Sequence, residues 1–432
     1  MLEYLDRFTD AVKRKLITRR LRSEIMGWVC FQLGAREHFA IPSYLHRQGI
    51  LDALVTDVWI PDLVSRSAMS RKIIPQNMLD RSDSDLASAR IESFAAQMIF
   101  FAGKNRFYDH RKNWELTIAR NDLFQKASIE KALSRGYFRQ SEGKSPVVFA
   151  YSYAALAILE ISRSMGCRTV VGQIDPGKWE ENHVANLLRK RDSSDKLGFR
   201  RAPESYWSSW RKELDLADAI IVNSEWSRYG LISEGVESNK IITVPLCYRR
   251  KQPSPKARSF PPSFSTETPL KVLFLGSLSG RKGVFEIIDA AKMLEEYPVN
   301  FTLVGSSNID LTYLNDRANI SWRGPRARTD AIPFFDSADV FLIPTHSDGF
   351  AITQLEAQAS GLPIIASRNC GTVVEQGKNG LLLPDVTAQS IFDAVTWCLQ
   401  HPNQLEVMSK EALRQSAKFH PDHVLAPLKD LT

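Results

Sequence analysis

The feature that most constrains the fold is an alternation of short apolar runs with helical stretches on both sides of a proline-rich segment. Residues 251–269, KQPSPKARSFPPSFSTETP, hold five prolines and almost no periodic apolar pattern, which is typical of a linker. Runs of strand length lie before it, at 28–33, 54–56, 147–150, 169–171 and 219–222, and after it, at 272–275, 301–304, 320–322, 340–343, 364–366 and 381–383. Because strands that alternate with helices form parallel sheets, we predict an α/β protein.

The alternation on both sides of the linker predicts two Rossmann-like, doubly wound domains that face a cleft. Segment 57–121 has no clear strand order, and we interpret it as an insertion without an assigned role. Ligands of open α/β sheets bind beyond the carboxyl ends of the strands, so we expect the functional site there. The predicted plan is an N-terminal domain at 1–250, the linker at 251–269, a C-terminal domain at 270–415, and a C-terminal helix at 416–432 that could cross back onto the first domain.

Composition excludes an integral membrane protein. Of the 432 residues, 44% are hydrophobic and 24% are charged, and no apolar run approaches the roughly 18 residues needed to span a bilayer. The first fifteen residues mix acidic and basic side chains, unlike a secretory signal, so we expect a cytoplasmic protein. The cysteines are scattered and without metal-ligand spacing, as expected where thiols stay reduced; they are Cys30, Cys167, Cys247, Cys370 and Cys398.

Positive charge is concentrated at the N-terminus. The chain carries a net charge of +7, and six basic residues lie between Lys13 and Arg22, within a stretch whose apolar residues recur at helical spacing over 1–26. One interpretation is an amphipathic helix lying on anionic lipid, at the inner face of the membrane. Another is a helix docked on the protein's own surface with a solvated basic face. We expect no nucleic-acid partner, because no basic stripe interleaved with aromatic residues follows.

An acidic motif follows the apolar run at 340–343. In SDGFAITQLEAQASGLP, Asp348 and Glu356 lie eight positions apart, and Gly349 permits a tight turn into a helix whose first N–H groups could face an anion. Such a motif suits a nucleotide sugar, with Glu356 presented to hydroxyl groups. Taken alone, Asp348 could instead cap the helix, and Glu356 could be a solvated surface residue.

A glycine-bounded loop, GSLSGRKG at 276–283, follows the run at 272–275. It delivers Arg281 and Lys282 to a helix start, where cations, N–H groups and the helix dipole would stabilise a diphosphate and its charge as a leaving group. The loop lacks the ending of a Walker motif. An Arg-Lys pair alone could be a solvated surface feature, but the acidic motif about 70 residues later favours a site.

At these residues the chain resembles the retaining glycosyltransferases of family 4, which have the GT-B fold. The resemblance extends from about residue 28 to the C-terminus and is strongest over 271–384. The family's Gly-Arg-Leu-x-x-x-Lys-Gly loop is matched by Gly276, Leu278, Lys282 and Gly283. Ser277 stands where the arginine belongs, so Arg281 could supply the second cation, or stabilisation of the diphosphate could rest on Lys282.

The family's acidic motif is similar to Asp348, Gly349, Phe350, Ala351 and Glu356 here. The resemblance implies that Asp348 and the backbone after Gly349 contact the donor sugar and that Glu356 holds the ribose. Aspartate replaces the usual glutamate and is one methylene shorter, which could favour a different donor. In the following family loop, we interpret Glu375 as a structural cap.

The resemblance also implies acceptor-side residues in the first domain. Gly34 lies in a loop similar to the family's glycine loop beneath the donor diphosphate. Arg36, Glu37 and His38 could meet the acceptor, or they could be polar residues that open a helix. Tyr151 stands near the position of one family histidine. The further candidates are Gln173 and Asp175, at the position of another family histidine, and Asn223 and Ser224, where capping by Ser224 is an alternative.

The residues and the resemblance together predict a retaining glycosyltransferase. We expect transfer of a sugar from a nucleotide-diphosphate donor to a hydroxyl of a glycan or lipid-linked acceptor, in bacterial surface-polysaccharide assembly, with Lys282, Arg281 and Asp348 at the reacting groups. We expect no cofactor and no metal, and we interpret Asp83 and Asp85 as loop or capping residues. A nucleotide-sugar epimerase or phosphorylase, or an inactive nucleotide-sugar or glycan-binding protein of the same fold, is the alternative.

Overall fold

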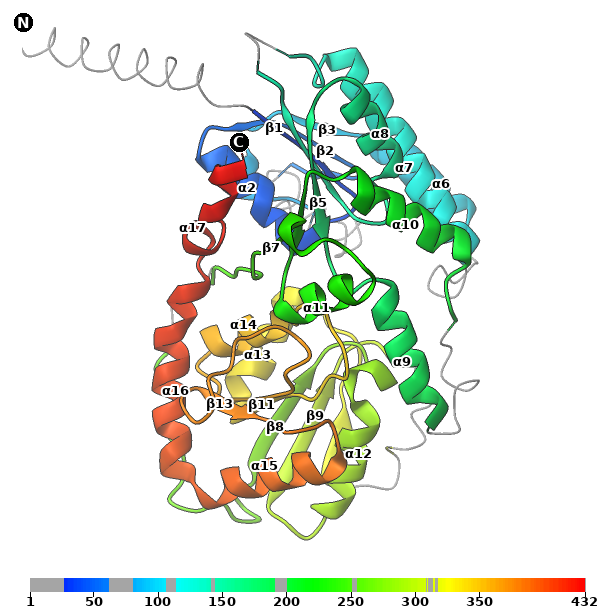
Figure 1. Cartoon of the computed structure of the whole chain (residues 1–432). Helices are drawn as coiled ribbons and strands as arrows, with labels where there is room; N and C mark the ends of the chain where they lie inside the picture. Colours follow the sequence, from blue (N-terminus) through cyan, green and yellow to red (C-terminus); the bar gives the residue numbers. More distant parts are fainter. Residues whose placement is uncertain are drawn as a thin grey trace, which may run out of the picture. The chain divides into compact units, whose positions relative to one another are not determined.

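The computed structural model describes residues 27–61, 81–105, 114–140, 144–190, 200–250, 255–307, 309, 314 and 318–431. The predicted basic helix at 1–26 and the first residues of the predicted linker, 251–254, lie outside this part of the chain. The chain divides into two compact units (Figure 1). The first unit takes its described residues from 27–172, 204–220 and 425–431, and the second from 173–203 and 221–424.

The described residues form a first sheet of seven strands in the order β3-β2-β1-β4-β5-β6-β7. β1 pairs in parallel with β2 and β4, β2 with β3, and β4 with β5. No residue of β1 is more than 1% exposed, as expected for a parallel strand covered on both faces. The strands are β1 (Trp28–Gln32), β2 (Leu51–Thr56), β3 (Ile91–Ser93), β4 (Val147–Tyr151), β5 (Arg168–Gln173), β6 (Ala219–Val222) and β7 (Ile241–Thr243).

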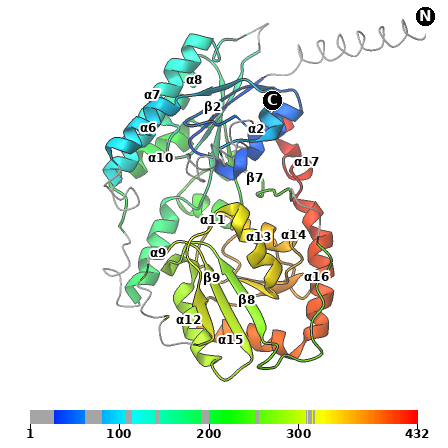
Figure 2. The same ribbon diagram turned by 180° about the vertical axis from the view of Figure 1, so that it is seen from behind.

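Helices cover this sheet on both faces (Figures 1 and 2). α7 packs against α8 and α8 against α10 on one side, and α2 packs against β2 on the other. Segment 57–121, predicted to be an insertion, supplies the edge strand β3, the helix α6 and the start of α7. The helices are α2 (Ala40–Arg47), α6 (Ala95–Lys104), α7 (Trp114–Arg135), α8 (Leu156–Ser164) and α10 (Glu204–Leu216).

The described residues of the second unit form a sheet of six strands in the order β10-β9-β8-β11-β12-β13, with every adjacent pair parallel. All eleven predicted apolar runs are thus strands, and the predicted fold class, two doubly wound parallel-sheet α/β domains, is confirmed. The strands are β8 (Leu270–Leu275), β9 (Val299–Val304), β10 (Ile320–Trp322), β11 (Val340–Ile343), β12 (Ile364–Ala366) and β13 (Gly380–Leu382).

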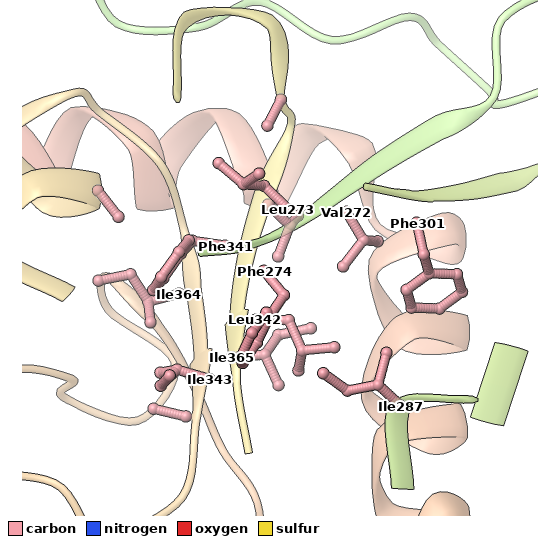
Figure 3. Close-up of a cluster of buried hydrophobic side chains, with 14 of the residues drawn as sticks. Val272, Leu273, Phe274, Ile287, Phe301, Phe341, Leu342, Ile343, Ile364 and Ile365 are labelled. Carbon is pink, nitrogen blue, oxygen red and sulfur yellow. The ribbon is translucent and has the colours of Figure 1, made fainter. Parts of the chain in front are cut away.

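The core of the second unit lies between this sheet and its helices. Figure 3 shows Phe274, Phe301, Phe341 and Ile365 from four strands, together with Ile287 of α12, in one buried cluster, and each is at most 1% exposed. α12 packs against α15, and α14 packs against α16. The helices are α9 (Lys178–Lys190), α11 (Glu225–Ser233), α12 (Val284–Met293), α13 (Arg328–Ser337), α14 (Ile352–Ala359), α15 (Ala388–Gln400), α16 (Pro402–Ser416) and α17 (Pro421–Val424).

The division between the units does not fall at the predicted linker. Residues 255–269, the described part of that linker, contain no helix or strand, but 173–203 and 221–250 already belong to the second unit, and 425–431 belong to the first. Of the helices in the described part of the chain, none has the length and apolar character needed to cross a membrane. The five cysteines are all described and are buried free thiols.

Candidate active site

The sheet of the second unit has a switch point between its neighbouring strands β8 and β11. After β8 the chain continues to β9 on one side, and after β11 it continues to β12 on the other side. Ligands of open α/β sheets bind at such a switch point. Arg281 and Lys282 lie in a 3₁₀ turn after β8, and Asp348 follows β11. The carbonyl of Arg281 accepts from the backbone N–H of His346 at 2.9 Å, which joins the loops.

Asp348 accepts hydrogen bonds from both predicted cations. The Nζ of Lys282 donates to Oδ2, and the Nη1 of Arg281 lies 3.4 Å from Oδ1. Burial would raise the pKa of Asp348, but the charges and hydrogen bonds of Lys282 and Arg281 hold it below its ordinary value. Capping by Asp348 is excluded, because Ala351 occupies the N-cap position of α14 and no side chain caps that helix.

A second carboxylate approaches Arg281 from α9. Glu180 Oε1 lies 3.5 Å from Arg281 Nη1 and accepts from Ser347 Oγ at 2.7 Å, and the Nε1 of Trp226 on α11 donates to that same Oγ at 2.8 Å. Burial raises the pKa of Glu180 to about 7, although Arg281 opposes the shift. We did not predict Glu180, Trp226 or Ser347, and only tertiary structure could reveal the contact between Glu180 and Ser347, which lie 167 positions apart.

The glycines of both loops are sterically required. A Cβ on Gly349 would lie 2.0 Å from the carbonyl oxygen of Ile174. Gly283 has a φ of +72°, and a Cβ there would lie 2.0 Å from the carbonyl oxygen of Pro344. Only glycine therefore permits the close approach of backbone at these two positions.

The other predicted donor residues of the second unit lie around the same switch point. Gly276 and Ser277 follow β8, and the N–H of Gly276 donates to the carbonyl of Val304 at 2.9 Å. Phe350 and Ala351 are buried, at 7% and 4% exposed. Glu356 on α14 is 9% exposed, so the alternative of a solvated surface residue is excluded.

Four predicted acceptor-side residues lie in the second unit and hold its loops. Gln173 Nε2 donates to the backbone oxygen and the Oδ1 of Asp175, both at 3.0 Å, and Asp175 accepts from the N–H of Gly177 at 2.9 Å. Asn223 Nδ2 donates to the carbonyl of Ile174 at 2.9 Å. Ser224 caps α11 through the N–H of Ser227 at 3.0 Å, and its hydroxyl donates to the carbonyl of Gly349 at 2.6 Å. The capping alternative for Ser224 is confirmed.

The remaining candidates belong to the first unit. Gly34 has a φ of +82°, and its backbone N–H donates to Asp57 Oδ1 at 2.9 Å. In this structure the N–H group of Gly34 is therefore already bonded to a carboxylate. Arg36, Glu37 and His38 follow in a short 3₁₀ segment before α2, in which Glu37 and His38 have non-helical backbone angles, and Tyr151 ends β4. Burial raises the pKa of Glu37 to about 7, although a hydrogen bond with Tyr151 and the charge of Arg36 oppose the shift.

Two interpretations of individual acidic residues can be tested directly. Asp83 caps the turn that follows it, accepting from the N–H of Asp85 at 2.9 Å, and Asp85 pairs with Arg47 at 2.7 Å. Both are therefore loop and capping residues, as predicted. The carboxylate of Glu375 pairs with Lys378 and Lys418, each at 2.8 Å, so the contacts described for it are surface ion pairs rather than the predicted cap.

Comparison with known proteins relates part of the chain to a sequence family and to curated relatives. Residues 255–415 match the sequence model of the family described as glycosyl transferases group 1. The chain is 27% identical over 258 residues to the D-inositol 3-phosphate glycosyltransferase of Corynebacterium urealyticum, covering 54% of this chain and 61% of the relative. A second relative is the N,N'-diacetylbacillosaminyl-diphospho-undecaprenol alpha-1,3-N-acetylgalactosaminyltransferase of Campylobacter jejuni. The two chains are 27% identical over 155 residues, which cover 34% of this chain and 40% of the relative. The chain thus spans less than two thirds of the length of these curated relatives.

Two solved structures share the fold. Anabaena HepE in complex with UDP has a TM-score of 0.58 at 14% identity, covering 94% of this chain and 99% of that chain. Sucrose-phosphate synthase from Thermosynechococcus elongatus has a TM-score of 0.65 at 16% identity, covering 94% of this chain and 98% of that chain. The fold of the chain is therefore that of the GT-B glycosyltransferases, and its residues 255–415 match the group 1 glycosyl transferases.

Proposed function

We propose that the protein is a retaining glycosyltransferase that moves a sugar from a nucleotide-diphosphate donor to a hydroxyl of a glycan or lipid-linked acceptor. The observation that carries the proposal is the arrangement of Arg281 and Lys282 around Asp348 at the switch point of the second sheet. The matched family supports glycosyl transfer. The relative named for diphospho-undecaprenol supports a lipid-linked acceptor, as in surface-polysaccharide assembly. The relative named for D-inositol 3-phosphate supports transfer to a hydroxyl of a phosphorylated acceptor.

The proposed reaction uses the cations to stabilise the leaving group. Lys282 and Arg281 neutralise the diphosphate, which gains charge as its bond to the sugar breaks. Asp348 keeps the two cations in place before the donor binds and orients the donor sugar afterwards. The departing phosphate accepts the proton of the attacking hydroxyl on the same face of the sugar, which gives retention. Since two side-chain cations serve the diphosphate, we propose that transfer needs no metal and that a chelator leaves the rate unchanged.

Donor binding is tested by thermal shift with a panel of nucleotide sugars. A ligand that binds only the folded state raises its apparent stability, so at least one donor should raise the melting temperature of the wild type. Lys282→Ala should abolish that rise. Lys292→Ala, which removes an exposed cation from the end of α12, is the matched control and should keep it. Equal shifts in the two variants would contradict the role of Lys282.

Turnover separates the proposed enzyme from an inactive binding protein of the same fold. We expect release of the nucleotide from the donor that binds, with the rate reduced at least a hundredfold by Lys282→Ala, because removal of one transition-state donor costs about that much. Donor binding without nucleotide release under any acceptor would favour the binding protein. Neither an epimerase nor a phosphorylase is favoured by the relatives.

We propose further that residues 1–26 attach the protein to anionic membrane at its cytoplasmic face. Six basic residues between Lys13 and Arg22 support this. Co-sedimentation with anionic vesicles should be stronger for the whole chain than for a chain without residues 1–26. Equal sedimentation would remove the proposal.

A further inference from the structure

The first sheet has a switch point of its own. The chain passes from β1 outward to β2, and from β4 outward to β5 on the other side, so the loops after β1 and β4 diverge. The loop after β1 contains Gly34 to Phe39, and β4 ends at Tyr151. A ligand site is expected at such a place in an open α/β sheet.

The loop after β1 holds an uncommon backbone conformation. Glu37, His38 and Phe39 have φ values of +49°, +52° and +62°, a region that residues other than glycine rarely adopt. Gln32, the last residue of β1, holds the loop by donating from Nε2 to the carbonyls of Gly34 and Arg36, at 3.1 and 2.9 Å. Strained backbone of this kind persists where the surroundings enforce it, and it clusters at ligand sites.

Arginine side chains gather around one buried carboxylate beside this loop. Asp57 follows β2 and is 1% exposed. The Nη1 of Arg81 lies 2.6 and 2.7 Å from its two oxygens, and the Nη2 of Arg120 on α7 lies 3.6 Å from Oδ2. Asp57 also fixes the loop through the N–H of Gly34. One carboxylate thus positions two guanidinium groups and the strained loop.

Positive charge exceeds negative charge in this cluster. Burial lowers the pKa of Arg120, the charge of Asp57 opposes the shift, and the charges of Arg81 and Arg36 lower the pKa further. The cluster therefore contains the three cations Arg36, Arg81 and Arg120. The carboxylates named beside them are Asp57 and Glu37, and burial keeps Glu37 partly protonated near neutral pH. The side chain of Arg120 is 41% exposed and Arg36 is exposed, so both can reach a ligand.

We propose that Arg36, Arg81 and Arg120 form a phosphate site that binds a phosphate group of the acceptor. Guanidinium groups suit this ligand because their planar forks match phosphate oxygens with two hydrogen bonds. Arg81 is held by Asp57, while Arg120 and Arg36 carry the surplus charge. This inference rests on the proposed function, because it assigns the phosphate to the acceptor rather than to the donor, whose cations are Arg281 and Lys282 in the second unit.

Titration calorimetry with inorganic pyrophosphate tests the phosphate site. The whole chain carrying Arg281→Gln and Lys282→Ala is the background, so that both donor cations are removed. In that background pyrophosphate should bind, and the double variant Arg36→Gln, Arg120→Gln should weaken binding at least tenfold. Arg81 is kept, so Asp57 retains its partner. Lys126→Gln, an exposed cation on the same helix α7, is the control and should bind as the background does.

Unchanged pyrophosphate binding in the Arg36, Arg120 double variant would overturn the inference, as would complete loss of binding in the background that lacks Arg281 and Lys282. The nucleotide-sugar thermal shift of the otherwise wild-type double variant is measured separately and should be kept. If no nucleotide sugar shifts the wild type while the arginine-dependent binding remains, the proposed function fails and the phosphate site stands.

The source of the phosphate is identified by two further probes, a soluble hexose phosphate and vesicles that contain a polyprenyl diphosphate. Arginine-dependent binding to the hexose phosphate supports a soluble phosphorylated acceptor, and arginine-dependent binding to the vesicles supports a lipid-linked one. Binding of either probe that the double variant leaves unchanged counts against the site.

Discussion

At the scale of single residues, the candidate site depends on side chains that bond to the backbone of distant loops. Ser224 is the clearest case, because it caps α11 and also donates to the carbonyl of Gly349 beside Asp348. Thr387 caps α15 in the same way, by accepting from the N–H of Ser390 at 3.2 Å, but it has no bond to the site loops. The two residues therefore form a matched pair.

Replacing each cap with alanine separates stability from function. We expect Ser224→Ala and Thr387→Ala each to lower the free energy of unfolding by about 1 kcal/mol, the usual cost of losing such a cap. Only Ser224→Ala should also weaken donor binding, because the Gly349 loop loses its anchor. Urea unfolding and donor titration measure the two effects. Equal donor affinities in the two variants would show that the hydroxyl of Ser224 only caps a helix.

The sequence predicted several residues of the site and missed others for a physical reason. Lys282, Arg281 and Asp348 lie in the loops that follow two predicted strands, so parallel topology brings them to one edge of the sheet. Glu180 lies on a helix whose placement depends on tertiary packing, and Arg81, which pairs with Asp57 after β2, lies in a segment without a strand pattern. Their contacts could not be read from spacing.

At the scale of elements, a buried carboxylate on α10 accepts hydrogen bonds from the N–H groups at the start of α8. Glu213 of α10 is 2% exposed and accepts from the N–H groups of Tyr153, Ala155 and Leu156 at the start of α8, at 2.7, 2.9 and 3.1 Å. Burial raises the pKa of Glu213 from 4.5 to about 7, even though these N–H groups favour the ionised form. The ionised carboxylate therefore costs the folded state free energy.

This shift predicts a pH dependence of stability. Below about pH 4.5 Glu213 is protonated in both states, and as the pH rises to about 7 only the unfolded state ionises readily, so stability falls by on the order of 3 kcal/mol. Glu213→Gln should remove this contribution. Urea unfolding at pH 5 and pH 8 should show a smaller loss in the variant than in the wild type, and identical losses would contradict the assignment.

The loop after β11 provides a second prediction about an element. Gly349→Ala should displace the loop, because its Cβ would overlap the carbonyl of Ile174, and we expect a lower melting temperature and a weaker donor shift. Gly103→Ala, in α6 with open space around the added Cβ, should be neutral or stabilising by up to about 1 kcal/mol. A donor shift that survives Gly349→Ala would show that the loop does not shape the donor site.

The short strands β3 and β7 show why the sequence did not reveal every element. Each spans three residues, and β3 reads Ile-Glu-Ser, with none of its side chains fully buried. Strands at or near an edge of a sheet need less apolar surface, so they leave a weak pattern. The central strands are continuous apolar runs, and for that reason all of them were predicted.

At the scale of the whole molecule, each of the two sheets places charged loops at its own switch point. The second unit presents Arg281 and Lys282 with Asp348, and the first presents Arg36, Arg81 and Arg120 with Asp57. In the second unit the arrangement follows from parallel topology, which gathers the loops after β8 and β11 at one edge. In the first unit topology places Arg36 and Asp57, and tertiary packing brings Arg81 and Arg120 to Asp57. We infer a division of labour in which the second unit binds the donor and the first binds the acceptor.

The most direct test of the donor site is a crystal structure of the protein with a nucleoside diphosphate. We expect density for the diphosphate within hydrogen-bond distance of Lys282 Nζ and Arg281, with at least one of these cations released from Asp348. A nucleotide bound elsewhere, with both cations still on Asp348, would contradict the proposal.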